Sequence, residues 1–172
     1  MYRVAVVAVL STLGVGQSAF AQFGSCNGGA NIAVRVKTSN GPTTITTHTY
    51  VALAGGSVSF SVPAGATRTF VVSFSGETRL IGNPLPPAGA SNWIELQMRD
   101  NGVVIQPQDS TSPLAFASAD TYQSQAATFC RTLTNTSASA VNHTLAVWWK
   151  VSGASGLTGW LDDWTLRLDV HQ

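Results

Sequence analysis

Charged side chains are scarce in this chain of 172 residues. Only 10% of the residues are Asp, Glu, Lys or Arg, whereas an ordinary globular domain carries roughly 25%. The nine basic and eight acidic side chains nearly cancel, which excludes the basic surface of a nucleic-acid binder or of a protein held on an anionic membrane. Serine and threonine, 37 residues together, predict a hydroxyl-rich surface instead. With little electrostatic repulsion, such a surface favours self-association or adhesion to neutral polar matter such as polysaccharide.

Long hydrophobic runs are also missing, apart from one near the N-terminus. Residues 1–21 combine a basic residue, Arg3, with an apolar stretch from Val4 to Gly16 and the small-x-small sequence Ala19-Phe20-Ala21. This order is typical of a cleaved export signal. The apolar stretch is too short for a bilayer core about 30 Å thick, so we predict no membrane span. We expect a single mature domain, residues 22–172, that is secreted, either extracellular or periplasmic.

Cysteine is limited to Cys26 and Cys130. In an oxidising compartment an isolated pair most simply forms one disulfide. Two thiols alone do not make a metal site, and we predict no bound metal. Lipidation of Cys26 is the alternative, because residues 23–26 faintly resemble a lipoprotein processing site. Against it, the apolar stretch ends well upstream and Cys130 would lack a partner.

Sequence patterns that carry catalysis in other proteins are absent. The chain has no Gly-x-Ser-x-Gly turn, no Gly-rich phosphate loop followed by Lys, no Cys-x-x-Cys pair and no zinc-ligand spacing of histidines. His143 lies in an apolar series, which favours a hydrogen-bonded core histidine. We predict no cofactor.

The two glutamates, Glu77 and Glu95, support one enzymatic alternative. In a small sandwich-fold glycoside hydrolase, one carboxyl would act as acid and the other as nucleophile or base. The competing interpretation places Glu95 at a solvent-facing strand position and Glu77 at a turn.

The chain is rich in alternating apolar and polar residues, the pattern of half-buried β-strands. The apolar members of six such series are Ile32, Val34 and Val36; Val58, Phe60 and Val62; Phe70, Val72 and Phe74; Ile94, Leu96 and Met98; Val141 to Val151; and Trp160 to Val170. Asn101-Gly102 predicts a two-residue hairpin, and residues 80–91 and 106–118 are expected to be surface loops. We therefore predict an all-β fold, an antiparallel β-sandwich of the jelly-roll type.

Four short segments resemble a known group of proteins. They are Phe74-Ser75-Gly76-Glu77, Asn92-Trp93, the strand from His143 to Trp149, and residues 161–166. Over residues 70–172 their order is similar to that of an uncharacterised group of secreted bacterial β-sandwich proteins. The resemblance implies a secreted β-sandwich and no activity.

Asp162 and Asp163 lie between two tryptophans, Trp160 and Trp164. If Trp164 faces the core, strict alternation points Asp162 inward, where a carboxylate must be paired or hydrogen-bonded. Backbone amides or an arginine are the expected partners. The alternative is a calcium site of Asp162, Asp163 and loop carbonyls, although no loop offers oxygen ligands at alternate positions.

Trp93 and Trp148 fall on outward-facing positions of their predicted strands. Exposed tryptophans often mark a contact surface, and their flat rings can stack on sugars. The alternative is that a loop such as residues 84–87, or a second copy, covers them. We expect a secreted or cell-surface binding or structural protein, without enzymatic activity, that recognises polysaccharide through these aromatic residues.

Two stretches, residues 38–67 and 132–149, contain no Asp, Glu, Lys or Arg. Charges normally protect strand edges against pairing with other chains. The strands in these stretches should therefore lie inside the sheets or meet a second copy in a homo-oligomer. The Thr-rich residues 43–49 are the least protected.

Overall fold

The computed structural model describes residues 26, 28–82, 92–106 and 114–172, and every regular element among them is a β-strand. The strands are β1 (Asn31–Ser39), β2 (Thr43–Ile45), β3 (Val51–Val62), β4 (Thr67–Ile81), β5 (Trp93–Asp100), β6 (Val103–Gln106), β7 (Leu114–Ala117), β8 (Gln123–Thr134), β9 (Val141–Ser152) and β10 (Thr158–His171). The predicted export signal, residues 1–21, and the covering loop at residues 84–87 lie outside the described residues.

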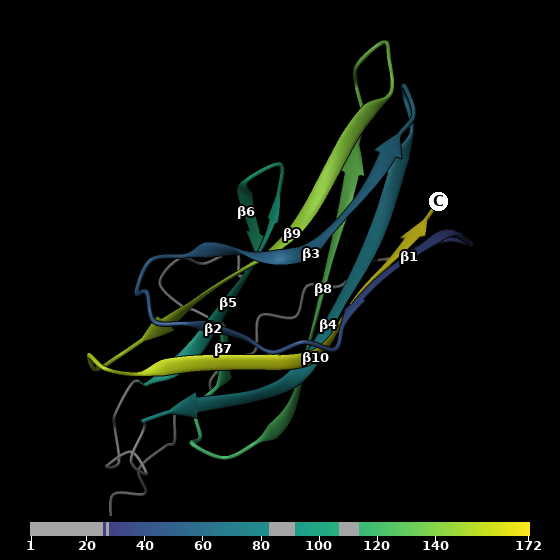
Figure 1. Cartoon of the computed structure of the whole chain (residues 1–172). Helices are drawn as coiled ribbons and strands as arrows, with labels where there is room; N and C mark the ends of the chain where they lie inside the picture. Colours follow the sequence, from purple (N-terminus) through teal and green to yellow (C-terminus); the bar gives the residue numbers. More distant parts are fainter. Residues whose placement is uncertain (1–25, 27, 83–91, 107–113) are drawn as a thin grey trace, which may run out of the picture.

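The strands form two antiparallel sheets packed against each other (Figure 1). Sheet A has the order β1-β10-β4-β8, with β2 beside β10, and sheet B has the order β3-β9-β5-β6, with β7 also beside β5. The antiparallel partners are nested along the chain: β1 with β10, β3 with β9, β4 with β8, and β5 with β6 and β7. Nested pairing that alternates between two sheets is the jelly-roll arrangement, so the predicted fold is confirmed.

Alternation points one face of each long strand into the space between the sheets. Fully buried side chains come from both sheets, including Phe70, Val72 and Phe74 of β4, Leu166 and Leu168 of β10, Leu96 and Met98 of β5, and Leu145 of β9. Each such side chain stabilises the fold by about 1.5–3 kcal/mol relative to an exposed position. The hairpin at Asn101-Gly102 is confirmed as well, with φ of 48° and 84°, the positive values that a type I′ turn requires.

A β-bulge in β10 reverses part of the predicted alternation. The register with β4 shifts between Asp162 and Thr165, and Asp163 has a φ of 44°. As a result Leu161 and Trp164, three residues apart, are both buried. The prediction that Asp162 points inward with Trp164 is therefore wrong, because the bulge inserts one extra residue between them. Trp160, predicted on the same face as Trp164, is half-buried and lies on the opposite face.

Strand β1 also differs from the prediction. The register with β10 sets Val34 opposite Asp169 and Val36 opposite Arg167, whereas Arg35 faces the buried Leu168. Directly opposed residues of antiparallel strands point to the same face, so the valines lie on the outer face of sheet A. Backbone hydrogen bonds of Gly29 and Ala30 with Gln172 fix this register at one end.

Two stretches predicted to be loops contain strand residues. Residues 106–118 include strand β7, and β4 runs to Ile81, into the stretch predicted to be a loop from residue 80. Strand β8 belongs to none of the six alternating series, because Gln, Ser, Thr and Ala make up most of it and it has a single buried side chain, Phe129. Its pairing with β4 over its whole length supplies the stability that its own apolar content does not.

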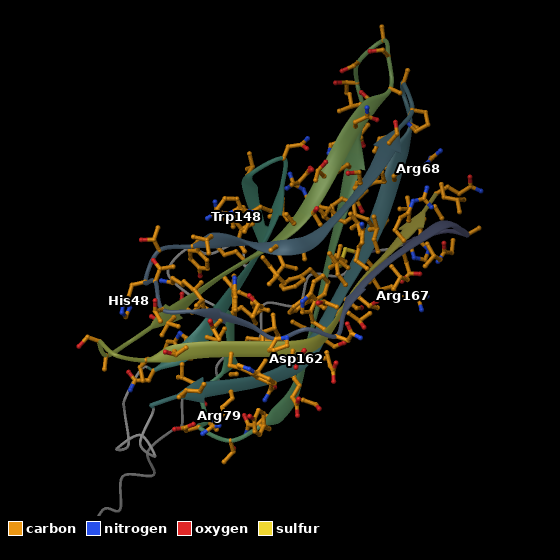
Figure 2. All side chains as sticks on the ribbon, in the orientation of Figure 1. His48, Arg68, Arg79, Trp148, Asp162 and Arg167 are labelled. Carbon is orange, nitrogen blue, oxygen red and sulfur yellow. A yellow bond between two sulfur atoms is a disulfide. The ribbon has the colours of Figure 1, made fainter. Side chains whose placement is uncertain are left out.

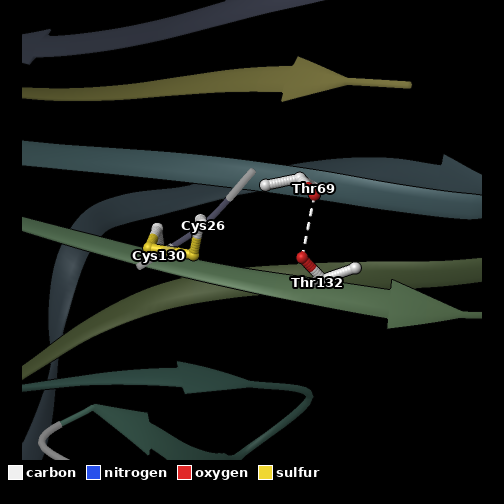
Figure 3. The surroundings of a disulfide bond; sticks show 4 residues. All are labelled: Cys26, Thr69, Cys130 and Thr132. Atoms are coloured by element: carbon white, nitrogen blue, oxygen red, sulfur yellow. Dashed lines mark hydrogen bonds between the residues drawn. A yellow bond between two sulfur atoms is a disulfide. The ribbon is translucent and has the colours of Figure 1, made fainter. Parts of the chain in front are cut away.

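The predicted disulfide is present and ties the start of the described chain to sheet A. Cys26 is bonded to Cys130 of β8, with their Cα atoms 6.0 Å apart (Figure 3). Gly28 then lies against His171, and Gly29 donates a backbone hydrogen bond of 2.7 Å to Gln172. Since β4 lies between β8 and β10, the chain before β1 crosses β4. With its thiol in the disulfide, Cys26 is not available for lipidation.

Candidate binding surface on sheet B

Seven outward side chains of sheet B form one connected group, which we call the Glu95 surface. They are Tyr50, Trp93, Glu95, Gln97, Arg99, Trp148 and Lys150. The register of β5 with β9 sets Glu95 opposite Lys150 and Gln97 opposite Trp148, and the residues between them on β5 are buried in the core. Trp93 and Trp148 are both half-buried on this outer face.

Glu95 is the centre of the group. Its carboxylate accepts hydrogen bonds from the Tyr50 hydroxyl at 2.9 Å and the Trp93 indole Nε1 at 2.7 Å, and it pairs with Lys150 Nζ at 2.9 Å. These partners cover it, so Glu95 is only 3% exposed. The expectation that Glu95 faces solvent is therefore wrong: the residue points outward, but its neighbours close over it.

The ionisation of Glu95 and Tyr50 follows from these contacts. Burial by itself would raise the pKa of Glu95, but hydrogen bonds from Lys150, Ser152, Trp93 and Tyr50 outweigh it and hold the pKa below its ordinary value. Burial and the hydrogen bond to Glu95 raise the pKa of the Tyr50 hydroxyl far above its usual range. Glu95 is thus a carboxylate and Tyr50 a protonated donor at neutral pH.

Arg99 fixes the other end of the surface. Its guanidinium lies 4.0 Å from the centre of the Trp148 ring and donates two hydrogen bonds to the Gln97 side-chain oxygen, at 3.1 Å and 2.8 Å. Lys150 Nζ lies 4.9 Å from the centre of the Tyr50 ring. Stacked cations of this kind hold aromatic rings in one orientation, so the rings are preorganised.

The structure does not bring the two glutamates together. Glu77 lies on β4 of sheet A, opposite Asp162, whereas Glu95 lies on β5 of sheet B. A glycosidase needs its two carboxyls about 5–10 Å apart across one cleft. The arrangement of Glu77 and Glu95 on two different sheets gives the hydrolase alternative no support.

Asp162 and Asp163 sit at the bulge. The Asp162 carboxylate accepts a hydrogen bond of 2.8 Å from the backbone N–H of Asp163, whose side chain is exposed. In the described part of the chain, no three His, Cys, Asp or Glu side chains gather as a metal site would require. The hydrogen bond between the two aspartates lies within the bulge, where the register of β10 with β4 shifts.

His143 has the hydrogen-bonded core environment that the sequence predicts. Its Nδ1 lies 2.8 Å from Asp100 Oδ2, and its ring stacks on Phe60 with the centres 5.2 Å apart. It also lines a pocket of about 210 Å³ at one end of the sandwich, together with Leu133 and Val141. His143 therefore has its partners within the core and is not part of the Glu95 surface.

A second aromatic group, which the alternation of the sequence did not indicate, lies on sheet A. Tyr122 is 59% exposed and packs edge-on against Trp160 with the ring centres 5.0 Å apart. Arg79 lies 5.3 Å from the centre of the Tyr122 ring and pairs with Asp120 at 2.7 Å. In Figure 2, Arg79 and Trp148 lie on opposite sides of the molecule. Only the bulge at Asp163, which strict alternation ignores, brings Trp160 to the outer face.

Comparison with known proteins gives this chain a distant structural likeness and no family. No family model matches the sequence, and no curated protein matches it. Among solved structures, it is similar to dimeric latent PorU from Porphyromonas gingivalis, with 11% sequence identity and a TM-score of 0.31. The similarity covers 87% of this chain and 14% of that protein. Separately, none of the described residues forms a helix long and apolar enough to span a membrane.

Proposed function

We propose that this chain is a secreted binding protein that recognises polysaccharide through the Glu95 surface. The observation that carries the proposal is the preorganisation of its half-buried aromatic rings. Trp93 is held by its hydrogen bond to Glu95, and Trp148 by the stacked Arg99. Rings fixed before binding lose little entropy when a ligand stacks on them.

The polar groups of the surface also suit a carbohydrate. The Gln97 amide lies opposite Trp148 in the strand register, and the Arg99 guanidinium lies over one face of the Trp148 ring. Both groups can hydrogen-bond to the hydroxyls of a sugar that packs against this aromatic group. Two cations and one carboxylate give the surface a charge of about +1, too small to require a strongly anionic ligand. A few oriented polar groups among apolar rings are typical of small-molecule sites.

Export is the second part of the proposal. The order of residues in 1–21 is typical of a cleaved signal. The Cys26–Cys130 disulfide is of the kind that persists in oxidising compartments outside the cytoplasm. The sparsely charged, hydroxyl-rich chain is compatible with adhesion to polysaccharide there.

The test is a binding screen on soluble and insoluble polysaccharides with the purified mature chain, followed by affinity measurement for each polysaccharide that is bound. Trp148→Ala should weaken binding about tenfold or more, since loss of a central aromatic contact costs more than about 1.4 kcal/mol. Trp148→Phe should retain part of the affinity because it keeps a ring. Hydrolysis assays on the same substrates should show no product.

Tyr122→Ala is the matched control, because it removes an exposed aromatic ring from the other sheet. It should leave the affinity unchanged. If Tyr122→Ala abolishes binding while Trp148→Ala binds normally, the ligand sits on sheet A and the Glu95 surface is the wrong site. If no polysaccharide binds the folded protein, the proposal as a whole is overturned.

A further inference from the structure

The two cations of the Glu95 surface differ in their partners. Lys150 forms an ion pair with Glu95 at 2.9 Å, whereas Arg99 donates its Nε and Nη2 hydrogens to the neutral side-chain oxygen of Gln97. Among the described residues, no carboxylate forms an ion pair with Arg99. Arg99 is half-buried, so water screens its charge only in part.

On sheet A the same contact is made with a carboxylate. Arg167 donates its Nε and Nη2 hydrogens to the two oxygens of Asp169, at 2.7 Å and 2.8 Å, and the two residues lie two positions apart on one strand. Gln97 also lies two positions from its arginine and accepts bonds from the same two nitrogens. A neutral amide thus takes the place of the carboxylate, and Arg99 keeps its full positive charge beside the aromatic rings.

The contacts of the Arg99 guanidinium leave one of its edges open. Its centre lies 4.0 Å from the centre of the Trp148 ring and 5.7 Å from that of the Tyr50 ring, and stacking of this kind leaves the in-plane N–H groups available. Gln97 occupies the edge formed by Nε and Nη2, and none of the described residues bonds to Nη1. The edge formed by Nη1 and Nη2 offers parallel N–H donors, which a carboxylate accepts with both oxygens.

We propose that the Glu95 surface selects polysaccharides that contain uronic acids, and that Arg99 binds the uronate carboxylate. This inference rests on the polysaccharide binding proposed above and names the class of polysaccharide. A uronic acid carries its carboxylate on the sugar ring, so the ring packs against the aromatic residues while the carboxylate pairs with Arg99. One carboxylate also matches the charge of about +1 that the surface carries.

The first experiment compares acidic polymers with their neutral esters. The purified wild-type chain is tested on polygalacturonate, alginate and hyaluronate, and on the methyl ester of each, which keeps the sugar rings and linkages but removes the charge. At least one acidic polymer should bind, and its ester should bind about tenfold more weakly or less, since an ion pair is lost. Added salt should weaken binding of the acid but not of the ester.

The outcomes of this comparison separate the two proposals. Equal affinity for an acid and its ester would overturn the selection of uronates and leave polysaccharide binding intact. The same holds for binding only to neutral polysaccharides, or only to a sulfated polymer such as dextran sulfate. If the folded chain binds no polysaccharide, the proposed function itself is overturned, and this inference fails with it.

The second experiment supplies Arg99 with a carboxylate from the chain itself. Gln97→Glu keeps a partner of the same shape and should pair with Arg99 as Asp169 pairs with Arg167. Affinity for the uronate polymer should fall about tenfold or more, because the ligand must now displace this carboxylate. Thermal unfolding checks that the variant is folded. Wild-type affinity in Gln97→Glu would overturn the role of Arg99.

Ala126→Glu is the matched control, because it adds the same charge at an exposed position on β8 of sheet A. It should bind as the wild type does, and an equal loss in Ala126→Glu and Gln97→Glu would assign the effect to net charge rather than to Arg99. Arg99→Lys is an independent variant that keeps the charge and removes the paired donors. It should also weaken binding of the uronate polymer about tenfold. Undiminished binding by Arg99→Lys would overturn recognition of a carboxylate by the guanidinium edge.

Discussion

The outer faces of the two sheets are both polar, but their hydrogen bonds are organised differently. On sheet A, hydroxyls pair one to one between β4 and β8: Thr67 with Thr134 at 2.9 Å, Thr69 with Thr132 at 2.8 Å, and Ser73 with Thr128 at 3.3 Å. On sheet B, Tyr50, Trp93 and Lys150 all converge on Glu95. Sheet A therefore has a row of separate pairs, whereas sheet B depends on one buried carboxylate.

This difference decides where a single change has consequences. A hydroxyl pair on an exposed strand contributes little, since water replaces a lost partner. Loss of Glu95 would leave its donors, the Tyr50 hydroxyl, the Trp93 indole and the Lys150 ammonium among them, without their common acceptor. Trp93 carries one of the rings that we propose bind ligand. The two sheets also differ in covalent cross-linking. The only disulfide that the two cysteines of the chain can form is attached to sheet A, and the described contacts of sheet B are non-covalent.

The largest effect is expected from removing the disulfide that supports sheet A. The bond joins residues 104 positions apart, and the chain-entropy model gives about 5 kcal/mol for a loop of that size. In guanidinium unfolding, the double variant Cys26→Ala/Cys130→Ala should have a free energy of unfolding lower than that of the wild type by about this amount. The wild-type chain under reducing conditions should show the same decrease in the free energy of unfolding. A decrease below about 1 kcal/mol would show that the bond constrains little of the unfolded chain.

A smaller loss is expected when the centre of the sheet B network is removed. Glu95→Gln leaves the Lys150 ammonium, 21% exposed, without its counter-charge. Breaking a buried pair costs about 3–5 kcal/mol, and partial exposure of Lys150 reduces this to about 2–3 kcal/mol. Urea unfolding measures the change.

The matched control is Glu77→Gln, on the outer face of sheet A, which should change stability by less than about 0.5 kcal/mol. Equal effects at Glu77 and Glu95 would contradict the contrast between the two faces.

Protonation should reproduce part of the Glu95→Gln effect. The pKa of Glu95 is lowered in the folded state, so its stabilisation is complete above the pKa of the unfolded chain, near 4.5, and is lost as pH falls through the folded value. Stability measured between pH 7 and pH 2 should fall more steeply for the wild type than for Glu95→Gln. Parallel curves would mean that the carboxylate is not preferentially stabilised by the fold.

The sequence predicted best what is decided locally. The six apolar series all lie in strands, and the turn at Asn101-Gly102 and the pairing of the two lone cysteines are present as predicted. Each of these predictions depends on neighbouring residues or on simple elimination. The outward placement of Trp93 and Trp148 follows from the same alternation. The sequence predicted a jelly-roll sandwich, but it did not predict which strand pairs with which.

What the sequence could not predict depends on register. One extra residue at Asp163 reverses the facing of Trp160 and Asp162. The pairing of β1 with β10 turns its valines outward. Among the partners of Glu95, Trp93 lies two positions away on the same strand, whereas Tyr50 lies 45 positions earlier in the chain and Lys150 lies on another strand, so no local pattern indicates these two. Alternation places Glu95, Arg99 and Lys150 at outward positions. A polar network could have been predicted from these three charges, since opposite charges on neighbouring strands favour pairing.

The smallest effect is expected for a single hydroxyl of sheet A. Thr67→Val keeps the β-branched shape and removes the hydroxyl that bonds to Thr134 at 2.9 Å. Thr67 is exposed, so the Thr134 hydroxyl can turn to water, and the free energy of unfolding should change by less than about 0.5 kcal/mol. A loss comparable to that of Glu95→Gln would mean that the hydroxyl pairs act together as one network. In that case the two faces would share the same organisation, and the Glu95 surface would not be the more sensitive of the two.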